Sequence, residues 1–143
     1  MLAHLNQVAQ SLGLPFGERK STYNSRLAQE LGLWAETRER GSRFHLAAFH
    51  AYFAKGQNLA KKDVLLEIAV TAGLDPSVAE KVIEERSFSD RVLADWQLSR
   101  DKGVTAVPTL SMNNSFLTGA RPYKDLVRFV ETAGAVSVHG KGR

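Results

Sequence analysis

Few side chains in this 143-residue sequence have the types and spacing that catalysis needs. The chain has no cysteine, so a thiolate nucleophile, a disulfide and a thiolate metal site are all excluded. His45 and His50 share a predicted helix, but a separation of five residues puts them about 140° apart around the axis, unlike the i, i+4 pairs that chelate metals. His4 and His139 lie in terminal segments. We therefore expect no metal site.

Paired acidic residues are the other candidates for chemistry. Glu36 with Glu39 and Glu84 with Glu85 each lie beside arginines in predicted helices, and this setting favours solvated ion pairs over general acid-base catalysis. The serines show no Gly-x-Ser-x-Gly elbow, and the glycines form neither a phosphate loop nor a dinucleotide pattern. The sequence thus offers no catalytic residue, and we expect no cofactor.

A proline-containing stretch before two short apolar runs is more informative. Residues 103–110 read Gly-Val-Thr-Ala-Val-Pro-Thr-Leu, and Asn113-Asn114 separates the two runs. Because proline has no N–H to donate, Pro108 belongs at a strand entry or a bend. Asparagine tolerates positive φ, so the pattern predicts a β-hairpin over residues 109–118.

Four motifs keep their order along roughly residues 10–133: Asn24-Ser25-Arg26-Leu27-Ala28, Ala51-Tyr52-Phe53 with Gly56 and Asn58, Gly73-Leu74-Asp75, and the stretch 103–110 with its hairpin and Gly119-Ala120-Arg121-Pro122. Together they resemble the DsbA-like thiol-disulfide oxidoreductases, particularly their FrnE-like branch.

This resemblance implies a thioredoxin-like fold that a helical insertion interrupts. In the family, a Cys-x-x-Cys pair in an N-terminal strand-helix unit does the chemistry, and no other side chain replaces the thiolate. We therefore interpret the chain as the C-terminal portion of such an oxidoreductase, which binds protein or peptide substrates and is redox-silent as given. A family member encoded without its redox half is the alternative.

The resemblance also implies where a substrate binds. The family's cis proline faces the redox cysteines, so we predict a cis Val107-Pro108 bond and assign substrate binding to Ala106, Val107 and Pro108, with the Val107 backbone pairing with an extended chain. Phe49 and Phe53 of the insertion are candidates for an apolar groove. From the residues alone, Pro108 is equally a rigid strand entry. A core role is the commoner fate of the aromatic residues Trp34, Phe44, Phe49, Tyr52, Phe53, Phe88 and Trp96.

Two other functions remain open. One is a stand-alone helical protein-interaction module that has shed redox chemistry. The other is a fragment of a glutathione-dependent hydroxychromene-carboxylate isomerase, although Gly119-Ala120-Arg121-Pro122 favours the FrnE-like branch.

Apolar periodicity predicts a mostly α chain with one β-hairpin. We divide it into a helical region at 1–102, a ββα portion of a thioredoxin-like α/β fold at 103–134 and a flexible tail at 135–143. The predicted helices begin near Leu2, Ser25, Ser42, Asp63, Pro76, Ser87 and Pro122.

Charge and hydropathy limit the partners. The formal charge of +4 comes from interspersed basic and acidic residues, so we expect no nucleic-acid binding. No apolar run approaches a membrane span and no signal peptide is visible, which makes the cytoplasm the default location, although an N-terminal signal could have been lost. A hairpin without the family's remaining strands exposes an edge and apolar side chains, so we also expect self-association.

Overall fold

The computed structural model describes residues 2–18 and 21–136. They form two compact units that divide between Trp96 and Gln97, whereas the sequence placed its division after residue 102. The described elements are seven α-helices, one π-helical turn and two strands, which is the mostly α class with a β-hairpin that we predicted. Most of the predicted flexible tail, residues 137–143, lies outside the described residues.

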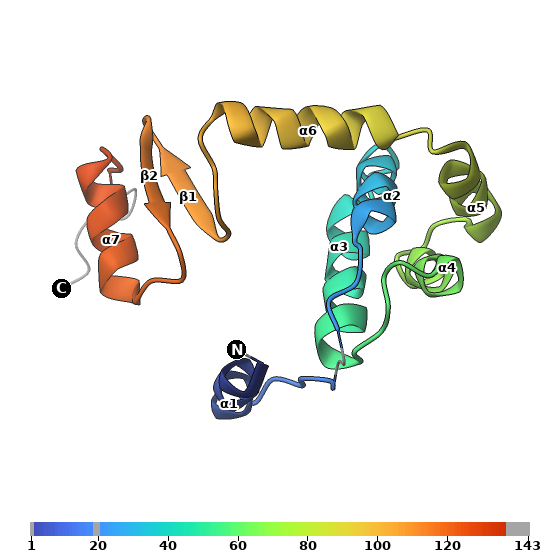
Figure 1. Cartoon of the computed structure of the whole chain (residues 1–143), viewed down its shortest axis with the longest axis horizontal. Helices are drawn as coiled ribbons and strands as arrows, with labels where there is room; N and C mark the ends of the chain where they lie inside the picture. The colour runs from blue at the N-terminus through green and yellow to red at the C-terminus, as the bar shows by residue number, and fades with distance from the viewer. Residues whose placement is uncertain (1, 19–20, 137–143) are drawn as a thin grey trace. The chain divides into compact units, whose positions relative to one another are not determined.

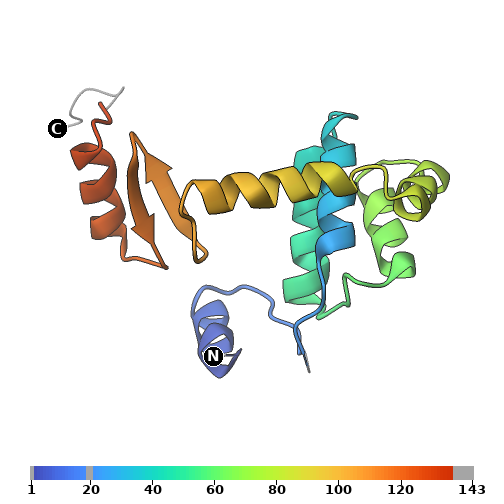
Figure 2. The same ribbon diagram turned by 45° about the horizontal axis from the view of Figure 1, so that its top comes forward.

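Four helices pack around the core of the first unit: α2 (Arg26–Glu36), α3 (Gly41–Phe49), α4 (Lys62–Thr71) and α5 (Pro76–Glu85). Helix α2 contacts α3 and α5, and α4 also contacts both (Figures 1 and 2). Leu31, Phe44 and Leu65 are completely buried between them. The unit thus has a hydrophobic core of its own.

Helix α5 begins as the sequence predicted. The Asp75 side chain accepts hydrogen bonds from the backbone N–H groups of Ser77 at 2.8 Å and Val78 at 3.4 Å. Pro76 occupies the first helical position, where no N–H is needed. Asp75 and Pro76 together explain the sharp start of this helix.

The boundary between α2 and α3 differs from the prediction. Helix α2 ends at Glu36 and not at Arg38, because Glu39 takes a positive φ of 57°. Helix α3 begins at Gly41, so the predicted cap Ser42 lies inside the first turn. A Cβ on Gly41 would lie 2.6 Å from the Glu36 Cγ, so the close approach of the two helix ends, not a capping side chain, sets this start.

Helix α3 continues into a π-helical turn, η1 (His50–Ala54), in which the Lys55 N–H donates to the His50 carbonyl at 3.2 Å. The sequence had indicated one uniform helix here. The expectation that the aromatic cluster is core is correct for Trp34 and Phe44, which are buried, and wrong for Phe49 and Phe53, which are 60% and 41% exposed.

Two further helices expose apolar side chains; one lies in the first unit, and the other contains the division between the two units. Helix α1 (Leu2–Ser11) forms as predicted, but it leaves Leu2, Leu5 and Val8 exposed. In α6 (Ser89–Asp101), Val92 is buried while Trp96 is exposed, so the core role expected for the aromatic residues is wrong for Trp96. The helical pattern indicated an apolar face in each case, but not whether anything covers it.

The second unit contains β1 (Thr109–Met112), β2 (Ser115–Thr118) and α7 (Tyr123–Thr132) (Figure 1). The strands pair antiparallel, with Met112 opposite Ser115, which confirms the predicted hairpin. Asn113 and Asn114 have φ of 47° and 62°, as a type I′ turn requires.

Candidate functional site

The candidate substrate loop joins α6 to β1. It begins with Gly103 at φ +72° and a bond from the Val104 N–H to the Ser99 carbonyl at 2.9 Å, and this arrangement closes the C-terminus of α6. The Val107–Pro108 peptide bond is cis, the geometry expected from the sequence. The preceding helix end therefore fixes where the loop starts.

Two hydrogen bonds hold the far end of this loop. The Thr109 hydroxyl donates to the Ala106 carbonyl at 2.7 Å, and the Gly119 N–H donates to the Pro108 carbonyl at 2.8 Å. Of the predicted site residues, Ala106 and Pro108 thus have carbonyls that are already engaged. Within the described residues, Val107 between them has neither its N–H nor its C=O in a backbone hydrogen bond.

Val107 projects into solvent. It is 88% exposed, and within residues 2–18 and 21–136 neither its N–H nor its C=O forms a backbone hydrogen bond. The loop leads into a strand edge. Because the Pro108 carbonyl pairs with Gly119 beyond β2, the alternation of an antiparallel ladder turns the N–H and C=O groups of Thr109 and Ser111 toward the opposite edge of β1. In the described part of the chain that edge has no neighbouring strand.

Phe49 and Phe53 form an aromatic surface on the first unit. Their ring centroids lie 6.3 Å apart, and the Tyr52 ring meets Phe53 edge-on at 4.9 Å. The predicted site residues therefore fall into two groups. The loop of Ala106, Val107 and Pro108 belongs to the second unit, and the aromatic surface belongs to the first.

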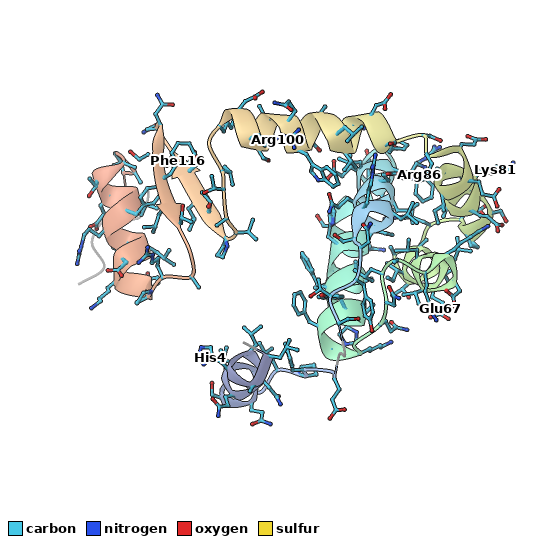
Figure 3. The ribbon with its side chains drawn as sticks, in the orientation of Figure 1. His4, Glu67, Lys81, Arg86, Arg100 and Phe116 are labelled. Carbon is cyan, nitrogen blue, oxygen red and sulfur yellow. The ribbon has the colours of Figure 1, made fainter. Side chains whose placement is uncertain are left out.

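An ion pair with a buried carboxylate lies in the first unit and was not predicted from the sequence. The Glu30 carboxylate is 1% exposed and accepts hydrogen bonds from the Arg86 Nε at 2.8 Å and Nη2 at 2.6 Å (Arg86 is labelled in Figure 3). The Arg26 Nε lies 3.3 Å from the same carboxylate. The bonds from Arg86, followed by the charges of Arg86 and Arg26, lower the pKa of Glu30 against the opposing effect of burial.

This pair links α2 to the end of α5, where Arg86 takes a left-handed conformation with φ 52°. A bidentate guanidinium bond of this kind compensates a carboxylate that has lost its water. The sequence did contain a signal, because Glu30 interrupts the apolar stripe of Leu27, Leu31 and Trp34. We assign Glu30 a structural role.

Other acidic residues behave as surface groups. Glu84 and Glu80 each lie 2.6 Å from the Lys62 ammonium, and Glu36 lies 3.6 Å from His45. Of the four glutamates expected to form solvated ion pairs, Glu84 forms one with Lys62, and Glu36 lies near the His45 ring. For Glu39 and Glu85 the expectation stays a prediction. The hydrogen bonds from Lys62 to Glu80 and Glu84 raise the pKa of Lys62. Across the described ranges, no group of three His, Asp or Glu side chains converges as a metal site would require.

No described helix combines the length and apolar character that crossing a bilayer demands.

Comparisons with known proteins bear on the loop and on the fold. A search of curated proteins gives no match to this chain. A family model described as DSBA-like thioredoxin domain matches residues 1–131. That match spans both compact units, including the helical insertion, the exposed loop and most of α7. The chain therefore belongs to the DSBA-like thioredoxin domain family.

Proposed function

We propose that this polypeptide is the substrate-binding and scaffold portion of a protein thiol-disulfide oxidoreductase of the FrnE-like branch. The single observation that supports this most is the solvent-exposed Val107 backbone, which makes no hydrogen bond in the described part of the chain and leads into the open edge of β1. An extended polypeptide can bind such an edge through main-chain hydrogen bonds, independently of its sequence. Broad recognition of unfolded substrates requires this independence.

The chemistry of the chain sets a limit on this role. Thiol-disulfide exchange needs a thiolate that attacks a disulfide sulfur, and the sequence has no cysteine. We expect the purified polypeptide to bind substrate segments without exchanging disulfides. An insulin-reduction assay checks this, and turnover above the rate of the dithiol reagent alone would contradict it.

Backbone recognition by Val107 can be tested with a matched pair of substitutions. We expect Val107→Pro, which removes the N–H, to weaken binding of an extended cysteine-free peptide about fivefold to tenfold. Val107→Ala keeps the N–H and should change the affinity less than about twofold. An NMR titration measures both. Equal losses in the two variants would assign recognition to the side chain and overturn this part of the proposal.

Phe49 and Phe53 form a separate proposed binding surface on the first unit. Both rings are exposed and packed against each other, so they can cover an apolar side chain of a substrate. We expect Phe49→Ser with Phe53→Ser to weaken peptide binding about tenfold. Leu98→Ser, which removes an exposed apolar residue of α6, is the control. If it weakens binding equally, the aromatic surface has no specific role.

We also propose that the chain self-associates. Leu110 and Phe116 are 40% and 46% exposed on the hairpin, and an open strand edge pairs readily with a second chain. Light scattering at about 50 µM should give a mass above the 15.8 kDa of one chain, and Leu110→Lys with Phe116→Lys should restore a monomer. A stable monomer of the unaltered chain would defeat the proposal.

A further inference from the structure

The first unit has a hollow between α3, η1 and α4. Its volume is about 610 Å³, within the range of pockets that hold small organic ligands. Ala47, Ala51 and Ile68 line its apolar part, and Leu46 lies at the margin with 72% of its surface exposed. Phe49 and Phe53 do not line this hollow, so it is separate from the aromatic surface.

Basic side chains surround the apolar part of the hollow. Arg43 of α3, His50 of η1 and Lys55, which follows η1, line it. Glu67 of α4, labelled in Figure 3, is the acidic residue of the lining. Neither Arg43 nor Lys55 forms an ion pair with any residue that the structure describes. Two cations that have no ion-pair partner in residues 2–18 and 21–136 therefore line a partly apolar hollow.

The π-helical turn explains why the Lys55 side chain lines the hollow together with His50. In a uniform α-helix, residues five apart lie about 140° from each other around the axis. The π-helical turn contains one residue more than an α-helical turn, because the Lys55 N–H donates to the His50 carbonyl five residues earlier. One residue corresponds to about 100° of rotation, and this brings Lys55 back toward the face that carries His50. Such π-helical turns recur at functional sites.

We propose that this hollow binds a small organic acid, with one carboxylate on an apolar body. The carboxylate pairs with the ammonium of Lys55, and the body covers Ala47, Ala51 and Ile68. Arg43 lies about three turns farther along the same helix and adds positive charge at the other end of the hollow. Glu67 opposes a second negative charge on the ligand, so a monoanion fits better than a phosphate. Ligand binding here is independent of the substrate role proposed for Val107.

An NMR titration with phenylbutyrate and its uncharged analogue phenylbutanol tests the proposal. We expect saturable shifts of the Ala47, Ala51 and Ile68 amides with the acid, and binding of the alcohol about tenfold weaker. For an acid of this size, a dissociation constant of about 1 mM is consistent with ordinary ligand efficiency. The absence of saturable shifts up to about 10 mM acid, or equal binding of the alcohol, would overturn the proposal.

Charge substitutions separate this site from general attraction to a basic protein. Arg43→Gln with Lys55→Gln should weaken phenylbutyrate binding about tenfold and leave phenylbutanol unchanged. Lys81→Gln with Lys102→Gln removes the same charge elsewhere and should alter the affinity less than about twofold. A comparable loss in both double variants would show that net charge alone attracts the acid, and the proposed site would be wrong.

Discussion

The two compact units differ in how they bury apolar side chains. In the first, helices α2 to α5 enclose Leu31, Phe44 and Leu65 completely. In the described part of the second, only Ala133 is buried, and Phe116 remains 46% exposed (labelled in Figure 3). A helical unit with its own core can be stable alone, whereas a two-stranded hairpin with one helix depends on turn chemistry and on cover from other segments.

The second unit indicates that secondary structure can form where few side chains are buried. Helix α7 and the hairpin form where the sequence predicts them, although they enclose no core of their own. Local signals therefore set the elements in both units, while stability depends on whether those elements find partners.

The strongest test of the contrast is the removal of a core side chain. Phe44→Ala should lower the free energy of unfolding of the first unit by about 3–5 kcal/mol, because a completely buried ring leaves a cavity. Urea titration followed by tryptophan fluorescence reports this unit, since both Trp34 and Trp96 belong to it.

Phe116→Ala is the matched control for that titration. This ring is half-exposed in the second unit, so we expect the tryptophan-detected transition to move by less than about 0.5 kcal/mol. Equal shifts in the two variants would mean that the units unfold together and that the contrast between them is wrong.

Removal of the Glu30 carboxylate should have the next largest effect on the free energy of unfolding. Glu30→Gln leaves Arg86 and Arg26 without their carboxylate, but both arginine side chains are partly exposed, so we expect a loss of about 2 kcal/mol from the first unit. Glu131→Gln, which removes an exposed acid of α7, should be nearly neutral at about 0.5 kcal/mol or less.

The same pair predicts the acid response of the first unit. Because the bonds from Arg86 hold the pKa of Glu30 below its ordinary value, its contribution is complete above the pKa of the unfolded chain and is lost as pH falls through the lower pKa of the folded state. The stability gap between the unaltered chain and Glu30→Gln should therefore be constant near neutral pH and shrink below about pH 4. A gap that widens on acidification would contradict this assignment.

Two glycines of the first unit have no room for a Cβ atom, Gly17 because of nearby backbone atoms and Gly32 because of a side chain. A Cβ on Gly17 would lie 2.7 Å from the Ala54 carbonyl oxygen, where the Gly17 N–H also donates to the Phe53 carbonyl. Because the backbone there cannot yield locally, Gly17→Ala should cost about 1–3 kcal/mol in the urea titration.

Gly32→Ala is the control within the same unit. Its Cβ would meet the His45 ring at 2.6 Å, but that ring is half-exposed and can move, and alanine favours a helix over glycine by about 1 kcal/mol. A loss as large as that of Gly17→Ala would show that the His45 ring is as fixed as backbone.

Local signals account for what the sequence predicted. Asp75 with Pro76 set a helix start, and Asn113 with Asn114 set a turn that needs positive φ. The exposure of Phe49 was not predictable in the same way, because periodicity defines an apolar face without saying what covers it. The π-helical turn changes one turn of an otherwise regular helix, which periodicity does not register.

The site residues likewise include some that a local motif indicated and some that only the structure shows. The motif around Pro108 indicated the loop, but only the structure shows that Val107 is exposed and without backbone partners in the described chain. Glu30 and Arg86 lie 56 residues apart, and no local pattern pairs residues at that distance. Long-range pairing was therefore the part of the structure that the sequence did not reveal.

The smallest predicted effect tests whether the second unit depends on its turn. The Asn113 side-chain N–H donates to the Ala133 carbonyl at 2.6 Å, which joins the turn to the end of α7. Asn113→Ala and Asn114→Ala both place alanine at a positive φ, and each should cost about 1 kcal/mol for that reason. Only Asn113→Ala also loses the bond to Ala133, which adds about 1 kcal/mol.

Amide hydrogen exchange of Leu110 and Leu117, which face each other in the hairpin, measures this difference. We expect both variants to loosen the hairpin, Asn113→Ala more than Asn114→Ala, while the amides of Leu31 and Leu65 in the first unit keep their protection. Equal loosening in the two variants would remove the role of the bond to Ala133. Loss of protection at Leu31 in step with the hairpin would show that the core of the first unit depends on the second, and the two units would then have to be treated as one cooperative structure.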